Sequence, residues 1–157
     1  MMRPLTLAGI AAAACAIGGV AQAAPADIAG RWATQGFGSI VALEPCVGDA
    51  RAWCGRIVWL WSPYDDHGRP RRDQRNPQDT QQRRPLVGVQ IVEGLREVSP
   101  GVWSEGRIYN PDDGRTYTGS VTLRGRTLEL RGCALKVVCQ TQVWRRPQDL
   151  LAAMEAR

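Results

Sequence analysis

Side chains that could carry chemistry gather in two polar stretches of the chain. Residues 62–84 contain the only histidine, and residues 106–117 read GRIYNPDDGRTY. Paired carboxylates and a nearby histidine are typical of general acid–base catalysis. The candidates for such work are Asp65, Asp66, His67, Asp73, Asp112 and Asp113. However, the chain has no G-x-S-x-G or H-E-x-x-H motif, and acids are common in polar loops. The sequence therefore favours a non-enzymatic protein without a cofactor, and a hydrolase of cell-envelope material is the less favoured alternative.

The stretch 106–117 predicts a β-hairpin corner. Pro111 presets φ for the first corner position, and Gly114 supplies the positive φ of a bulged turn. One interpretation is a stable turn and nothing more. The other is a polar rim at the mouth of a barrel, in which Tyr109, Asp112 and Tyr117 contact a ligand.

The first residues resemble an export signal. Arg3 gives a positive start, an apolar run follows from Leu5 to Val20, and Ala21-Gln22-Ala23 is a small-x-small cleavage site. The run is too short for a membrane anchor. We expect residues 1–23 to be removed, leaving 24–157 as one domain with a short C-terminal tail in the periplasm or outside the cell.

Export favours disulfides among the four cysteines that remain. Three pairings are possible, and the local ones, Cys46–Cys54 and Cys133–Cys139, are favoured because each spans a short loop between extended runs. A zinc site is the rival, but the chain lacks C-x-x-C spacing and has only His67, so we expect no metal.

The remainder of the chain reads as short strands with hairpin turns, interrupted by one long polar loop at 62–84. The pattern predicts an all-β fold, a small antiparallel up-and-down barrel of seven to eight strands. In the run 55–61, Trp59 and Trp61 share a strand face with Ile57, which would place both indoles toward the interior.

The first strand opens with Gly30-x-Trp32, which resembles the lipocalin signature. In lipocalins that Trp closes one barrel end beneath an Arg that follows the last strand. Arg145 or Arg146 would take this role by stacking on the indole.

The whole mature chain resembles an exported bacterial family known as domain of unknown function 2147. The motifs that carry the resemblance are Gly30-x-Trp32, the run 54–60, Asp73 with Asn76-Pro77, Arg84-Pro85-Leu86 with Gly88, the corner 106–117, Leu130-x-Gly132-Cys133 and Gln142-x-Trp144-x-Arg146. One departure is Asn110, where the family usually has Asp. The resemblance implies a lipocalin-like barrel that holds a small apolar ligand, and implies no known activity.

Composition agrees with a binding role. The chain has six Trp against one Phe, and its formal net charge is +5. The arginines are interleaved with Asp and Gln, which indicates a solvated surface and no nucleic-acid partner. We expect binding of a small apolar or lipid-like molecule by Trp59, Trp61, Tyr109, Asp112 and Tyr117. An envelope stress protein that acts through a protein partner is the alternative, and the oligomeric state stays open.

Overall fold

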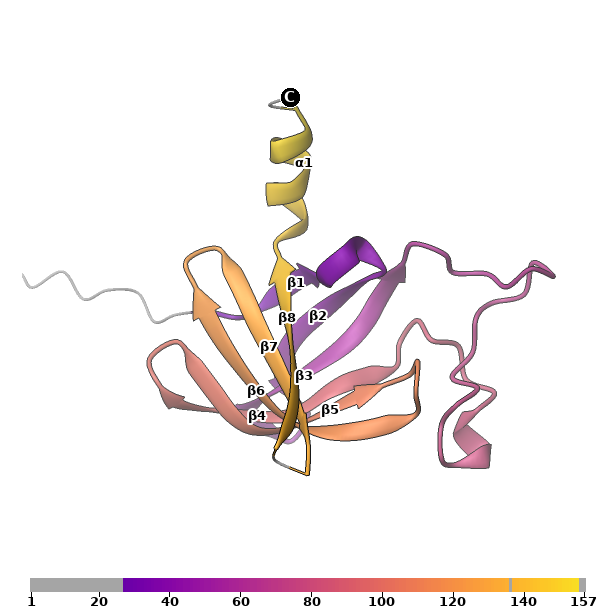
Figure 1. Cartoon of the computed structure of the whole chain (residues 1–157), viewed down its shortest axis with the longest axis horizontal. Coiled ribbons are helices and arrows are strands. Elements are labelled where there is room, and N and C mark those ends of the chain that lie inside the picture. The colour runs from indigo at the N-terminus through magenta and orange to yellow at the C-terminus, as the bar shows by residue number, and fades with distance from the viewer. Residues whose placement is uncertain (1–26, 136, 156–157) are drawn as a thin grey trace, which may run out of the picture.

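Eight antiparallel strands form a closed barrel in which each strand neighbours the next along the chain (Figure 1). The computed structural model describes residues 27–135 and 137–155. The all-β up-and-down fold is therefore confirmed. The elements are β1 Gly30–Ala33, η1 Gln35–Phe37, β2 Ser39–Cys46, β3 Asp49–Leu60, η2 Asp79–Gln81, β4 Gln90–Ser99, β5 Val102–Asn110, β6 Arg115–Arg124, β7 Thr127–Ala134, β8 Val138–Arg145 and α1 Pro147–Glu155.

The predicted export signal, residues 1–23, lies outside the described residues. No helix in the part of the chain that the structure describes has the length and apolar character needed to cross a bilayer.

The barrel interior is filled by aliphatic side chains and three buried indoles, Trp32, Trp103 and Trp144. Three glycines, Gly55 of β3, Gly106 of β5 and Gly119 of β6, face this core. A Cβ at any of them would come within 3.0 Å of a core side chain, a distance that real Cβ atoms almost never show. Side chains of the adjacent strands therefore pack directly against the backbone at these glycines. The expectation of an open cavity at the centre of the barrel stays a prediction.

One end of the barrel is closed by Trp32. Its indole is 1% exposed, and its Nε1 donates to the Ile28 carbonyl at 2.9 Å. The Arg146 guanidinium lies 3.8 Å from the ring centroid and donates to the Ala29 carbonyl at 2.7 Å. Of the two arginines considered from the sequence, Arg146 thus makes the stack, and Arg145 instead pairs with Ala33 through the backbone.

Both predicted disulfides, Cys46–Cys54 and Cys133–Cys139, are present. The strands around the first pair differ from expectation. β3 begins at Asp49, so Cys54 lies inside a strand and not at the end of a loop. β4 begins at Gln90, and the residues just before it end the long loop.

A β-bulge in β3 reverses the predicted direction of Trp59. Ile57 pairs with Val41, but Trp59 pairs with Ile40, so Val58 is the extra residue between two ladder positions. After the bulge the alternation is shifted: Ile57 is buried, whereas the Trp59 side chain is 42% exposed. Trp61 follows the end of β3 and is 72% exposed. The prediction that these indoles point inward is therefore wrong.

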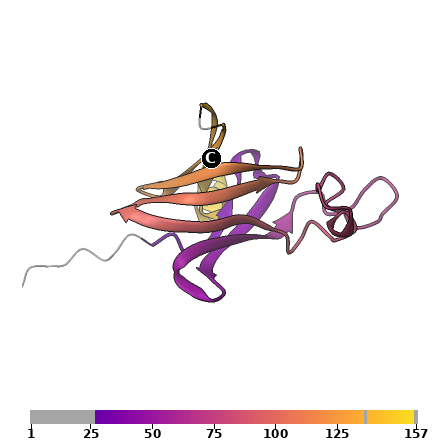
Figure 2. The same ribbon diagram turned by 90° about the horizontal axis from the view of Figure 1, so that it is seen from below.

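Two connections project from the end of the barrel opposite Trp32. They are the long loop, residues 61–89, and the corner between β5 and β6, residues 111–114. Figure 2 shows the long loop extending beyond the strands at this end. Isolated bridges between Tyr64 and Pro70 and between Arg72 and Pro85 give the loop internal structure.

Candidate functional site

A buried carboxylate anchors the long loop to the barrel. The Asp73 side chain is 0% exposed. Its Oδ2 accepts from Arg84 Nε at 3.0 Å, from Arg84 Nη2 at 2.7 Å and from Asn76 Nδ2 at 2.8 Å, while its Oδ1 accepts from the Tyr109 hydroxyl at 2.5 Å. We call Asp73, Asn76, Arg84 and Tyr109 the Asp73 cluster. Because three of its members belong to the loop and Tyr109 belongs to β5, the cluster joins the two.

Tyr109 lies on the face of β5 opposite the buried Ile108, hence on the outside of the barrel. Its hydroxyl also accepts from Asn76 Nδ2 at 3.2 Å. Burial, followed by the hydrogen bond to the Asp73 carboxylate, raises the pKa of Tyr109 to about 12. The phenol therefore stays protonated and continues to donate to Asp73 throughout the physiological range.

The corner supports the same loop. Arg75 Nη1 donates to the Asp112 carbonyl, and Gly114 packs directly on the backbone of Arg75. Gly114 has φ of +71°, and a Cβ there would overlap the Arg75 carbonyl oxygen. The glycine is thus required both by the turn and by the close approach of the loop.

The anchored loop encloses a hollow of about 350 Å³ against the outer faces of β4, β5 and β6. Amide and hydroxyl groups dominate its wall, and both guanidiniums in it are already paired, Arg84 with Asp73 and Arg107 with Glu93. Its lining residues are Asn76, Pro77, Gln78, Gln81, Arg84, Gln90, Ile91, Glu93, Arg107, Tyr109 and Thr116. The hollow therefore offers hydrogen-bond donors and acceptors with little net charge.

A second hollow of about 370 Å³ lies on the outer face of β2, β3 and β4 and shares Gln90 and Glu93 with the first. Its wall includes the Cys46–Cys54 disulfide, Arg56 and the Asp49–Arg96 ion pair. No part of the long loop before Gln90 lines it.

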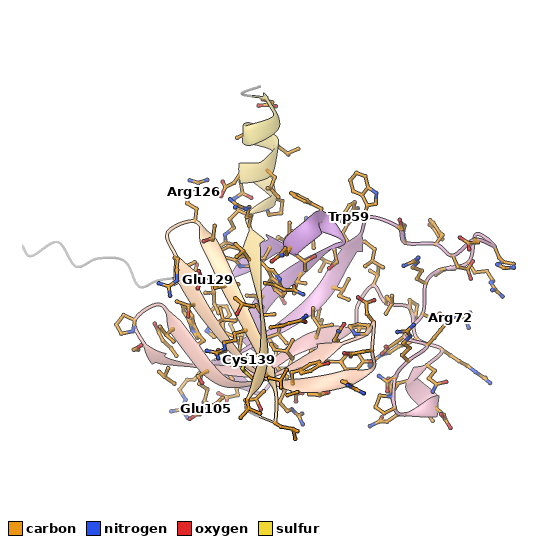
Figure 3. The ribbon with its side chains drawn as sticks, viewed as in Figure 1. Trp59, Arg72, Glu105, Arg126, Glu129 and Cys139 are labelled. Atoms are coloured by element: carbon orange, nitrogen blue, oxygen red, sulfur yellow. A yellow bond between two sulfur atoms is a disulfide. The ribbon has the colours of Figure 1, made fainter. Side chains whose placement is uncertain are left out.

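The predicted binding residues do not form one group. Tyr109 lines the hollow, whereas Asp112 is exposed at the corner. Tyr117 pairs with Ile108 across β5 and β6, and its hydroxyl donates to Asp113. Figure 3 shows Trp59 directed away from the barrel, on a different part of the surface from Arg72 of the long loop.

Three of the candidate catalytic acids, Asp65, Asp73 and Asp113, are occupied by structural contacts. Asp65 accepts from the His67 backbone N–H at 2.9 Å and pairs with Arg69, which stabilises a local turn. Burial opposes ionisation of Asp113, but the bonds from Tyr117 and the Arg115 N–H outweigh it, so the pKa of Asp113 is lowered. Both oxygens of Asp73 accept hydrogen bonds, from Arg84, Asn76 and Tyr109. These contacts give the three acids structural roles.

Sequence reasoning assigned no role to Asn76 and Arg84, although both belong to the motifs listed above. Proline follows each of them, and Asp73 lies three residues before Asn76. A proline restricts the preceding residue to extended conformations, so this spacing carried a usable signal for an ordered loop.

Comparisons with known proteins agree with the barrel. The model of a family described as "Uncharacterized protein conserved in bacteria (DUF2147)" matches residues 30–146. No curated protein matches the chain. Among solved structures, the chain is similar to protein HP1028 from Helicobacter pylori, which is described as belonging to the lipocalin family. The identity is 23%, the TM-score is 0.64, and the match covers 76% of this chain and 82% of that one. The chain therefore belongs to the DUF2147 family, and its fold is a lipocalin-like barrel.

Proposed function

We propose that this chain is an exported binding protein, without enzymatic activity, that holds one small polar molecule in the hollow beside Tyr109. The observation that carries the proposal is the Asp73 cluster. A buried carboxylate with four donor contacts fixes the loop over the strands, so the hollow exists before a ligand arrives. Preformed pockets of about 300–1,000 Å³ are usual for small-molecule sites.

The lining favours an uncharged ligand that is rich in hydroxyl or amide groups. Gln78 and Gln90 each present both a donor and an acceptor, and Gln81, whose Oε1 accepts from Arg84 Nη1 at 3.0 Å, presents its N–H groups. An ionic ligand would have to displace Asp73 from Arg84 or Glu93 from Arg107, which costs one of the two existing ion pairs. Ile91 adds an apolar side chain to the wall of the hollow, against which the carbon face of a sugar ring or a similar ring can pack.

A small apolar ligand within the barrel, the ligand expected from the sequence, is less favoured. The two hollows described above both lie on the outside of the barrel, and side chains of adjacent strands cover the inward glycines at 55, 106 and 119. Trp59 and Trp61, the indoles expected to hold it, lie outside.

Export to an oxidising compartment is part of the proposal. Two disulfides within one small barrel suit the periplasm or the extracellular space. N-terminal sequencing of the protein recovered from the periplasm should start at Ala24. Recovery of the intact N-terminus from the cytosol would contradict this part of the proposal.

The binding proposal is tested by NMR titration of the exported chain with a panel of mono- and disaccharides and with matched apolar probes. We expect backbone shifts confined to the hollow and a loss of affinity of about tenfold in Gln78→Ala, the effect of one lost hydrogen bond of about 1.4 kcal/mol. Glu44→Ala, in the other hollow, is the matched control and should bind as the parent does. Binding of an apolar probe with shifts on the barrel core would refute the assignment.

A further inference from the structure

The closure of the barrel between β8 and β1 is incomplete. All eight residues of β8 pair with β7, and all four residues of β1 pair with β2. Between β1 and β8, however, only Ala33 and Arg145 pair. After Ala33 the chain leaves the sheet through η1, so within residues 27–135 and 137–155 no strand lies beside most of β8 on that side; Figure 1 shows short β1 behind the upper end of β8 only.

Backbone N–H and C=O groups alternate in direction along β8, and this alternation identifies those that point away from β7. The Val143 N–H donates to the Gln35 side chain at 3.0 Å, so it points away from β7. Arg145 also points that way, toward Ala33. In an antiparallel ladder every second residue directs its N–H and C=O to the same neighbour, so Cys139 and Thr141 point to the same side. The Cα–Cα distance of 4.0 Å between Cys133 and Cys139 agrees, because it is that of a non-hydrogen-bonded pair.

We propose that the free edge of β8, the outward N–H and C=O groups of Cys139 and Thr141, pairs with the same edge of a second copy of this chain. The segment 137–144 contains no charged residue and no proline, the features that natural edge strands use to prevent such pairing. Antiparallel self-pairing about a two-fold axis at Gln140 places each Cys139 opposite the partner's Thr141. This register forms four backbone hydrogen bonds.

The position of Gln35 limits this pairing. Its side chain already occupies the Val143 N–H, so a second strand pairs along β8 only as far as Thr141. Val137, which is 78% exposed, therefore lies just beyond the paired residues of each copy. The two Gln140 side chains meet at the axis as a close cross-strand pair, in which amides can bond to each other.

Analytical ultracentrifugation of the exported chain tests the proposal. An edge-to-edge interface of this size belongs with weak and transient ones, so dimers are expected at roughly 0.1–1 mM protein. Thr141→Pro removes one outward N–H and leaves the bonds to β7 intact, since proline is tolerated where an edge N–H faces solvent. We expect at least a tenfold loss of dimer affinity in this variant. Thr141→Val, which keeps the N–H, should dimerise as the parent does.

A second variant separates loss of pairing from misfolding. Gln140→Lys leaves the backbone unchanged but places two like charges together at the axis, so it should also prevent dimerisation, less so at high salt. Thermal melts check that each variant is folded. A parent that stays monomeric over the whole range would overturn the proposal, as would proline and lysine variants that dimerise as tightly as the parent.

Discussion

Replacement of Asp73 by Asn should release the long loop while the barrel stays folded. The carboxylate accepts two bonds from Arg84 Nε and Nη2 and one each from Asn76 and Tyr109. The amide is of similar size but is uncharged and has only one acceptor oxygen. Each charge-assisted bond contributes about 1.5–3 kcal/mol and a neutral one about 0.5–1.5 kcal/mol. The Arg84 side chain is 36% exposed, so water compensates part of the loss. We expect a net loss of about 2–4 kcal/mol.

Amide hydrogen exchange shows where this free energy is lost. The N–H groups of Asp73, Asn76 and Leu86 donate to backbone carbonyls within the loop. In Asp73→Asn they should exchange about 30- to 1,000-fold faster, since each 1.4 kcal/mol corresponds to a factor of ten. Core amides such as that of Val121 should change much less.

The matched control is Asp65→Asn in the same loop. Asp65 also pairs with an arginine, but that pair is exposed, with Arg69 at 66%, so the free energy of unfolding should change by less than about 1 kcal/mol. Unchanged exchange in the loop of Asp73→Asn, or equal effects of the two variants, would refute the view that Asp73 anchors the loop.

Three further predictions concern the two ends of the barrel. Trp32→Ala should lower the free energy of unfolding in urea by about 3–5 kcal/mol, because it leaves a cavity in the core. Arg146→Lys should lower it by only about 0.5–2 kcal/mol, because it weakens the stack on the indole and leaves the core filled. The folded-state pKa of Tyr109 is raised to about 12 from its ordinary value of 10.0. The stability that Tyr109 contributes is therefore complete below pH 10 and is lost as pH rises toward 12. Alkaline denaturation of Tyr109→Phe should lack this loss of stability between pH 10 and 12. Gly114→Ala should lower the melting temperature more than Gly68→Ala, because both glycines have φ of +71° but only Gly114 lies against the backbone of Arg75. Equal melting temperatures of the two variants would exclude a role for that contact.

The fold could be predicted from local signals that tertiary structure does not change. Each signal involves only a few neighbouring residues. The alternating runs form strands and residues 111–114 form the turn between β5 and β6. Gly30-x-Trp32 lies at the barrel end where Arg146 stacks on Trp32. The cysteine pairs are equally local, because each joins residues in one hairpin.

The direction of Trp59 could not be predicted, because a bulge adds one residue without a sequence signal. The run 55–61 is apolar on both faces, so the pattern gave no sign that alternation shifts at Val58. The Asp73 cluster was missed for a different reason. Its members come from positions 73, 76, 84 and 109, and only the folded loop brings Tyr109 to Asp73.

The position of the polar hollow follows from the way the barrel is built. Side chains of adjacent strands cover the inward glycines: Leu43 covers Gly55, Leu95 covers Gly106 and Ile108 covers Gly119. The polar hollow lies on the outside of the barrel, where a connection that folds back over β4, β5 and β6 leaves space. The long loop provides it, and a carboxylate with no exposure holds that loop in one position. Binding specificity would then depend on the loop residues of the hollow, such as Gln78 and Gln81, and not on the core.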